Sequence, residues 1–540
     1  MNDDVTLADV VDGAIGRWQR MRQEATRQVA DRDFQTWLFE TVPAQAARLG
    51  EYDPRDHAFI VYEIVTALYR AGNIADAFLL LRWFGVHYAH HPDADLAERV
   101  ITMLTDLCAY TGRADAAGNA AAARVLRDVV DGARRPVDVR VERALCRALA
   151  THAYLRSDYL GAGSRSSKYA ELAALWTEMF RRYRHSQDPH LRGRAAQGLY
   201  NAALVWLQKG RDKIARKKFA ELLTWFGQDR GSNPDVDEWL SRAEHAGTVL
   251  GRFAVGEPEL NLSYLQRQRY WDIQRRRKGF GVPWLLAGAP RNHMAKLVRA
   301  AREKHHSSVG QVRSWLCSGE PFVLLLRNFD LVEASTASSP LASVLEDPDD
   351  PQGDHVHAIS YRDCEAALAE LERAVSMITV ASTKAGELEL ASTFGQFVPR
   401  TALYLPDATW FDTVSTLIPL ATQIVVWAAE LTPALAQELS CLQEHQRCGE
   451  TLVIIDTPSS PMQQAFLPGP AHDRLTTDHP ALVAFPHIVN AHELKDRSVA
   501  ECPSLLRVVR ALETARAGPV RQRLVAIRAH LEASSRRDSR

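Results

Sequence analysis

The sequence predicts a multidomain chain of two kinds of structure: helices through its first half, and a doubly wound, mostly parallel α/β sheet in its second half. Across residues 5–253, apolar side chains recur three and four positions apart and no strand pattern appears, which indicates helices. The second half instead contains unbroken apolar runs of strand length, at residues 322–326, 377–381, 423–427 and 451–455. A strand that is apolar on both faces has to be covered on both faces, as in a parallel sheet between layers of helices.

Length and composition indicate a globular protein with several domains. The chain has 540 residues, which is too many for one hydrophobic core. Its formal net charge is −1, so the overall charge gives no argument for a nucleic acid or a membrane as partner. No apolar stretch is long enough for a membrane helix, and the first residues have no signal-peptide pattern. The seven cysteines are scattered and are expected to be reduced, so we expect a cytoplasmic protein.

Three places in the first half share a glycine followed five positions later by an alanine. They are Gly72 with Ala77, Gly112 with Ala117, and Gly210 with Ala215. The pattern resembles the turn of a tetratricopeptide hairpin, where Gly closes the first helix and a small residue lets the second helix pack closely. This resemblance implies an α-solenoid whose surface recognises a protein partner or a sensed molecule, or drives self-association. Because the spacing of the glycines is irregular, a helical bundle without repeats is the alternative.

We expect four segments along the chain. They are a helical-repeat domain at 1–255, a basic helical connector at 256–318, an α/β domain at 319–495, and Arg-rich helices at 496–540. Within the connector, residues 264–278 hold six Arg or Lys side chains and a single acid. Such a segment is usually the solvated face of a helix. Contact with a phosphate-bearing ligand or a nucleic acid is the alternative, and nucleic-acid binding is the least favoured of the functions considered.

The order of elements in the second half alternates between strands and helices. Strands are expected at 322–326, 377–382, 402–405, 423–428, 452–455 and 482–485, with helices at 361–374, 410–420 and 432–446. Right-handed crossovers would arrange these elements as a doubly wound sheet. Parallel sheets bind ligands at the carboxyl ends of their strands, so any chemistry is expected where the apolar runs end.

Several common nucleotide-binding and catalytic motifs are missing from the sequence. It contains no phosphate loop of the type Gly-x4-Gly-Lys-Ser/Thr, no Gly-x-Gly-x-x-Gly after the first strand, no Gly-x-Ser-x-Gly and no His-Glu-x-x-His. The side chains of Cys441, His445 and Cys448 would share one helix face, but no fourth ligand lies nearby, so no metal site is expected.

Residues 322–330, Phe-Val-Leu-Leu-Leu-Arg-Asn-Phe-Asp, resemble the first strand and loop of bacterial TIR-like (Toll/interleukin-1 receptor-like) domains. Those domains often begin with an apolar strand, an Arg, an aromatic residue and an Asp. Later parts follow the same order, with a strand and Asp at 402–407, Trp410, a strand at 421–426, and a helix from 432 that contains Glu438. Glu438 lies about one and a half turns into this helix, where the family has its Glu.

The resemblance covers the stretch 321–458 and is closer in the order of elements than in residue identity. The usual Phe-Ile-Ser-Tyr start is absent, the loop after the first strand is long and acidic, and no Trp-Cys precedes Glu438. The resemblance implies a flavodoxin/TIR-like sheet for the α/β domain.

The enzymatic members of the family cleave the nicotinamide–ribose bond of NAD, so the resemblance implies Glu438 as a catalytic carboxylate. A fixed anion would stabilise the positive charge that develops on the ribose. Arg327 would hold a phosphate, Phe329 or Trp410 would stack on a base or on nicotinamide, and Asp330 would orient Arg327 or a ribose hydroxyl. NAD would be the substrate, and neither a cofactor nor a metal would be required.

These observations predict a regulated, NAD-cleaving effector in bacterial antiphage defence or signalling, with the helical repeats as sensor or scaffold. The alternative is a non-enzymatic protein-interaction or nucleotide-sensing adaptor. Each residue also has a structural interpretation. Glu438 would be an ordinary exposed helix acid, Arg327 and Asp330 a structural pair, and Phe329 and Trp410 core residues. The expected partners are a protein or a second copy of the chain and a nucleotide, and no membrane.

Overall fold

The structure is a computed structural model with two compact units. Unit 1 comprises Met1–Ala203 and Ala220–Leu240, and unit 2 comprises Leu204–Phe219 and Ser241–Arg540. The structure describes residues 7–24, 27–44, 53–89, 91–111, 116–132, 138–158, 166–253, 255, 289–327, 364–382, 400–405, 409–428, 430–456, 473–495 and 497–537.

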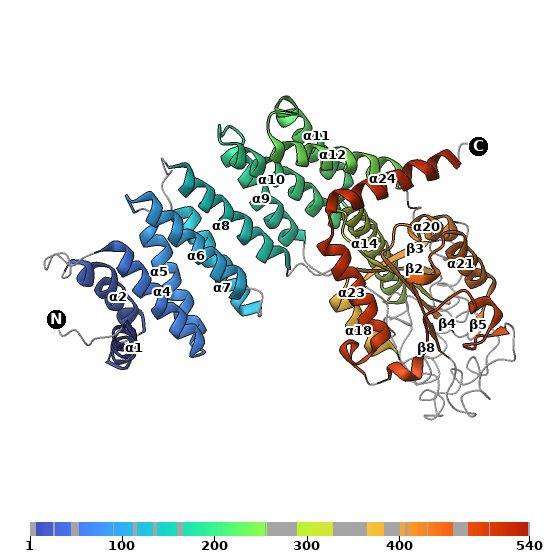
Figure 1. The fold of residues 1–540 in the computed structure, drawn as a ribbon, viewed down its shortest axis with the longest axis horizontal. Coiled ribbons are helices and arrows are strands. Elements are labelled where there is room, and N and C mark those ends of the chain that lie inside the picture. The colour runs from blue at the N-terminus through green and yellow to red at the C-terminus, as the bar shows by residue number, and fades with distance from the viewer. Residues whose placement is uncertain are drawn as a thin grey trace. The chain divides into compact units, whose positions relative to one another are not determined.

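The N-terminal half is helical, as predicted. Its elements are α1 (Leu7–Glu24), α2 (Arg27–Thr36), η1 (Trp37–Thr41), α4 (Pro54–Arg70), α5 (Ile74–Tyr88), α6 (Ala94–Thr111), α7 (Ala116–Gly132), α8 (Val139–Asp158), α9 (Ser166–Tyr183), α10 (Pro189–Gln208), α11 (Asp212–Phe226), η2 (Gly227–Asp229) and α12 (Pro234–Arg252). Neighbouring helices pack on one another, α4 on α5, α5 on α7, and α6 and α7 on α8 (Figure 1). Buried residues at helical spacing, such as Val61, Ile64, Val65 and Leu68 in α4, supply the contacts.

Two of the three glycine turns predicted from the sequence lie in the described residues, and both close a helix. Gly72 has φ +78° and Gly210 has φ +69°, in the left-handed region that favours glycine. In both turns the next backbone N–H reaches back to a carbonyl in the last turn of the helix. Asn73 donates to Leu68 O at 2.9 Å, and Arg211 donates to Trp206 O at 2.9 Å. Ala77 and Ala215 are buried early in the following helices, while Gly112 lies outside the described residues.

The α/β part contains an open sheet in which all neighbouring strands run parallel, which confirms the prediction of a parallel sheet. Its strands are β1 (Val323–Arg327), β2 (Met377–Ser382), β3 (Thr401–Leu405), β4 (Gln423–Ala428), β6 (Thr451–Ile455) and β8 (Ile488–Asn490). A separate antiparallel pair joins β5 (Glu430–Leu431) to β7 (Asp473–Arg474). All four apolar runs of the sequence form buried strands in the sheet.

The last strand lies further along the chain than predicted. Residues 482–485 were expected to form a strand, but Pro480–Leu482 is a 3-10 turn and Val483 is 82% exposed. His479 Nδ1 accepts a hydrogen bond from Ala481 N at 3.2 Å, and Pro480 at the first position favours the turn. The strand that completes the sheet is β8.

The strand order is β3-β2-β1-β4-β6-β8. Counted along the chain, the described strands therefore run 3-2-1-4-5-6, which differs from the 2-1-3-4-5 order of flavodoxin-type sheets. The chain moves outward from β1 to β3 and then returns to place β4 on the other side of β1. The order of strands thus reverses between β1 and β4.

Helices cover both faces of the sheet (Figure 1). Helix α18 (Glu365–Ala374) connects β1 to β2, whereas α21 (Pro433–Glu444) connects β4 to β6 in the opposite direction across the sheet. Because parallel crossovers are right-handed, these two helices lie on opposite faces. Helix α20 (Trp410–Leu417) contacts α21.

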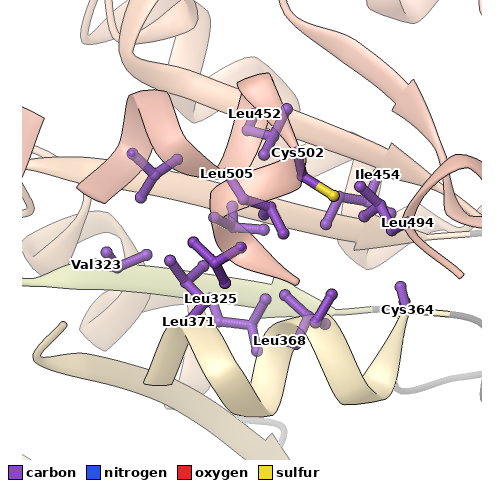
Figure 2. Packing of buried hydrophobic residues seen from close by; sticks show 14 of the residues in the cluster. Val323, Leu325, Cys364, Leu368, Leu371, Leu452, Ile454, Leu494, Cys502 and Leu505 are labelled. Carbon is purple, nitrogen blue, oxygen red and sulfur yellow. The ribbon is translucent and has the colours of Figure 1, made fainter. Parts of the chain in front are cut away.

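The face beneath α18 carries a large hydrophobic cluster that also includes α23 (Pro503–Ala517). Figure 2 shows Leu325 and Ile454 of the sheet together with Leu368 of α18 and Leu505 of α23. No residue of α21 belongs to this cluster of described residues, in agreement with its place on the other face.

The edge strand β3 is covered by α14 (Ala289–Ser318). Ser308 Oγ accepts a hydrogen bond from Ala402 N, and His305 Nδ1 accepts one from Tyr404 N, both at 3.1 Å. All four residues are buried, and the two side chains satisfy alternate backbone N–H groups that an exposed edge would leave open.

Helix α24 (Val520–Arg537) packs on α14. Within the described ranges, no helix combines the length and the apolar character needed to cross a membrane.

Candidate functional site

Three neighbouring strands bring polar side chains to the carboxyl edge of the sheet. Arg327 ends β1 and is paired in register with Trp427 of β4, while Asp456 directly follows β6. Side chains alternate along a strand, so Arg327, Trp427 and Asp456 share the face of the cluster members Leu325 and Ile454. The indole Nε1 of Trp427 donates a hydrogen bond to Asp456 Oδ2 at 3.1 Å.

The charged members of this group are unusually well buried. Arg327 is 7% exposed and Asp456 is 8% exposed, although such side chains are rarely buried without a partner. Both also have further interactions within the chain. A guanidinium and a carboxylate are thus held, shielded from water, at the ends of the two strands that flank β4.

The site coincides with the topological switch point of the sheet. Arg327 ends β1 and Trp427 is the penultimate residue of β4, and the strand order reverses between these two strands. Open parallel sheets bind ligands in the crevice outside the strand ends at this point. The segments that follow four of the strands, at 328–363, 383–399, 406–408 and 457–472, lie outside the described residues.

Glu438 lies on the buried side of α21, beside Leu435, Leu439 and Leu442, and is 2% exposed. Thr432 caps the helix, with its Oγ1 accepting a hydrogen bond from Leu435 N at 3.2 Å, so Glu438 lies about 9 Å along the axis from the helix start. It is thus not the exposed helix acid of the structural interpretation. It also has an interaction within the chain.

The structure does not bring Arg327 and Glu438 into one cleft of the described residues. The side chain of Arg327 belongs to the face covered by α18, and α21 covers the other face. Trp410 begins α20, in the same helix layer as Glu438, and is partly exposed, with its ring centroid 5.4 Å from that of Phe411. Phe329 and Asp330 lie outside the described residues.

Sequence reasoning missed two members of the group, Trp427 and Asp456. The rule that ligands meet strand ends points to Asp456, since this residue directly follows the last of the four apolar runs. Trp427 lies at the end of the apolar run 423–427 and has a side-chain N–H donor. The sequence does not reveal which neighbouring strand supplies the acceptor. Its partner depends on the register between β4 and β6.

The cysteine and histidine group near the end of α21 is not arranged as expected. The helix ends at Glu444, the chain turns at Gln446 with φ +56°, and Cys448 begins a separate 3-10 helix. Cys441 and Cys448 therefore do not share one helix face. Across the part of the chain that the structure describes, no group of three or more His, Cys, Asp or Glu side chains is placed to hold a metal ion.

Comparison with protein-family models, curated proteins and solved structures found no match to this chain. The TIR-like resemblance of residues 321–458 therefore stays a prediction. Function is inferred from the geometry and the chemistry of the described residues.

Proposed function

We propose that the α/β unit binds a nucleotide, such as NAD or ADP-ribose, at the carboxyl edge between β1 and β4, and that the protein is a nucleotide-sensing adaptor. The single observation that carries this proposal is the buried guanidinium of Arg327 at the point where the strand order reverses. A guanidinium binds a phosphate through two parallel hydrogen bonds, and a site shielded from water strengthens that interaction.

Asp456 and Trp427 supply complementary chemistry at the same edge. The carboxylate of Asp456 is held by the indole N–H of Trp427. A carboxylate fixed in this way accepts hydrogen bonds from ribose hydroxyls, the role of the acidic residue in other dinucleotide sites. The helical half would then recognise a protein partner or a second copy of the chain and report nucleotide binding in defence or signalling.

Isothermal titration of the full chain with NAD and with ADP-ribose tests this proposal. Arg327→Lys keeps the charge but removes the two-pronged contact, and we expect it to weaken nucleotide binding by about tenfold or more. Arg521→Lys is the matched control, because Arg521 is exposed on α24. Equal affinities of the Arg327→Lys variant and the unchanged protein would remove Arg327 from the site.

Cleavage of NAD is the second candidate function, and the burial of Glu438 favours it. A carboxylate shielded from water stabilises a developing positive charge more strongly than an exposed one. Since Arg327 belongs to the opposite face, such a site would work without this side chain.

Release of nicotinamide from NAD by the full chain tests this second candidate. Glu438→Gln should abolish release, and Glu444→Gln, an exposed acid on the same helix, should not. Arg327→Lys should leave the rate unchanged if cleavage takes place on the α21 side. An undiminished rate in Glu438→Gln would exclude this carboxylate from the reaction.

A further inference from the structure

Helices α7, α8 and α9 line a cavity of about 550 Å³ within unit 1 that is partly open to solvent. Its volume falls in the range of small-molecule sites, roughly 300–1,000 Å³. Polar and charged side chains come from all three helices, including Arg127 of α7, His152 and Arg156 of α8, and Lys168 of α9. One wall is apolar and is made by Leu172, Ala174 and Leu175 of α9.

The cavity carries an excess of positive charge. Four cationic side chains line it, Arg127, Arg156, Lys168 and Arg181, against the two carboxylates Glu171 and Glu178. Arg127 already forms two ion pairs, since its guanidinium lies 2.7 Å from the Glu178 carboxylate and 2.6 Å from the Asp131 carboxylate. Arg156, Lys168 and Arg181 form no ion pair with any carboxylate of the described residues. Positive charge therefore remains uncompensated at the cavity.

A buried histidine forms part of the cavity lining. His152 is 5% exposed, and its Nδ1 is shielded from solvent without a hydrogen-bond partner among the described residues. Burial, followed by the nearby charges of Arg156 and Arg127, lowers the pKa of His152 to about 4, so the ring is neutral at pH 7. The ring therefore adds no positive charge to the cavity, whose cationic character comes from its Arg and Lys side chains.

We propose that this cavity binds a small molecule that carries a phosphate monoester. Near neutral pH a phosphate monoester has a charge of about −1.5 to −2, which matches the excess of cations. Arg156 and Lys168 would bind the phosphate. The wall at Leu172 and Leu175 would contact an apolar or planar part of the ligand. This site is independent of the carboxyl edge of the sheet.

Isothermal titration of the full chain with a panel of phosphate monoesters, AMP, GMP, CMP and glucose 6-phosphate, tests the proposal. At least one compound should bind, and its dephosphorylated form should bind at least tenfold more weakly. The double variant Arg156→Gln/Lys168→Gln should weaken binding at least tenfold. Both side chains are exposed, so their replacement should leave the fold intact, which circular dichroism would check. Arg99→Gln, an exposed arginine on α6, is the control and should bind as the unchanged protein does.

Two outcomes would overturn the proposal. One is that no compound of the panel binds at millimolar concentration, and the other is that the double variant keeps the full affinity. Arg327→Lys separates this site from the strand edge, because a monoester held in the cavity should bind this variant with unchanged affinity. Binding that is lost in Arg327→Lys and kept in the double variant would assign the ligand to the sheet and exclude the cavity.

Discussion

The indole Nε1 of Trp427 lies 3.1 Å from Oδ2 of Asp456 and joins the end of β4 to the residue that follows β6. Both side chains are buried, so the carboxylate depends on this donor more than an exposed one would. The bond holds the carboxylate at the carboxyl edge of the sheet, one strand away from the switch point between β1 and β4.

Trp427→Phe keeps an aromatic ring and removes the N–H donor. We expect the free energy of unfolding to fall by about 1–3 kcal/mol, because a buried carboxylate loses a hydrogen bond. Chemical denaturation of the full chain, followed by circular dichroism, measures the change. Asp456→Asn and the double variant complete a mutant cycle, in which we expect a coupling of at least about 0.5 kcal/mol. Strictly additive effects would show that the bond contributes nothing.

Ser308→Ala tests how the edge of the sheet is protected. The substitution leaves the buried N–H of Ala402 without its acceptor, so we expect a loss of about 1–3 kcal/mol and faster hydrogen exchange at that amide. Ser440→Ala is the control, since Ser440 is exposed and its hydroxyl donates a hydrogen bond to Ala436 O of its own helix. Unchanged exchange at the Ala402 amide in Ser308→Ala would contradict the role of this hydroxyl.

His152 predicts a pH dependence of stability in unit 1. Its pKa is lowered from 6.5 to about 4 by burial, so below pH 6.5 the unfolded chain takes up a proton that the folded chain does not. The free energy of unfolding should therefore decrease by about 1.6 kcal/mol between pH 6.5 and pH 5 on account of this residue.

Thermal unfolding at several pH values compares the unchanged protein with His152→Gln. The variant should lose less stability over this interval, while the control His185→Gln, at an exposed position, should follow the unchanged protein. Parallel pH profiles of the His152→Gln variant and the unchanged protein would refute the buried, neutral state of this ring.

Gly310→Ala tests the close approach of α14 to the end of α10. A methyl group at Gly310 would overlap the carbonyl oxygen of Leu207, a backbone atom that cannot move aside as a side chain does. We expect a loss of about 1–3 kcal/mol in the free energy of unfolding. Gly449→Ala is the matched control, because a methyl group there meets no atom of the described residues within 4 Å. Equal denaturation midpoints for the two variants would contradict the contact.

The sequence predicts the strands of the sheet well, because a strand that is buried on both faces consists of consecutive apolar residues, as in the run 451–455. The final strand was misplaced for a local reason, since Pro480 and the cap from His479 form a turn within an otherwise apolar segment. The turn formed by His479 and Pro480 there outweighs the apolar composition of the segment.

The candidate site was harder to predict than the strands. Arg327 follows directly from the end of an apolar run, but its neighbours depend on which strands pair and in which register. The hydrogen bond between Trp427 and Asp456, which are 29 positions apart, can be predicted only once that register is known. To predict that Arg327 and Glu438 lie on opposite faces of the sheet, one must know which face each strand residue points to and the handedness of the crossovers. Neither can be read from residue spacing.

The contact between Gly310 and Leu207 has a practical consequence for dissecting this protein. Unit 2 includes Leu204–Phe219 as well as the chain from Ser241 onward, whereas Ala220–Leu240 belongs to unit 1. No single proteolytic cut can therefore release both halves whole, because any fragment beginning near residue 256 leaves behind the helix end against which α14 is seated. Functional dissection should rely on point variants in the intact polypeptide.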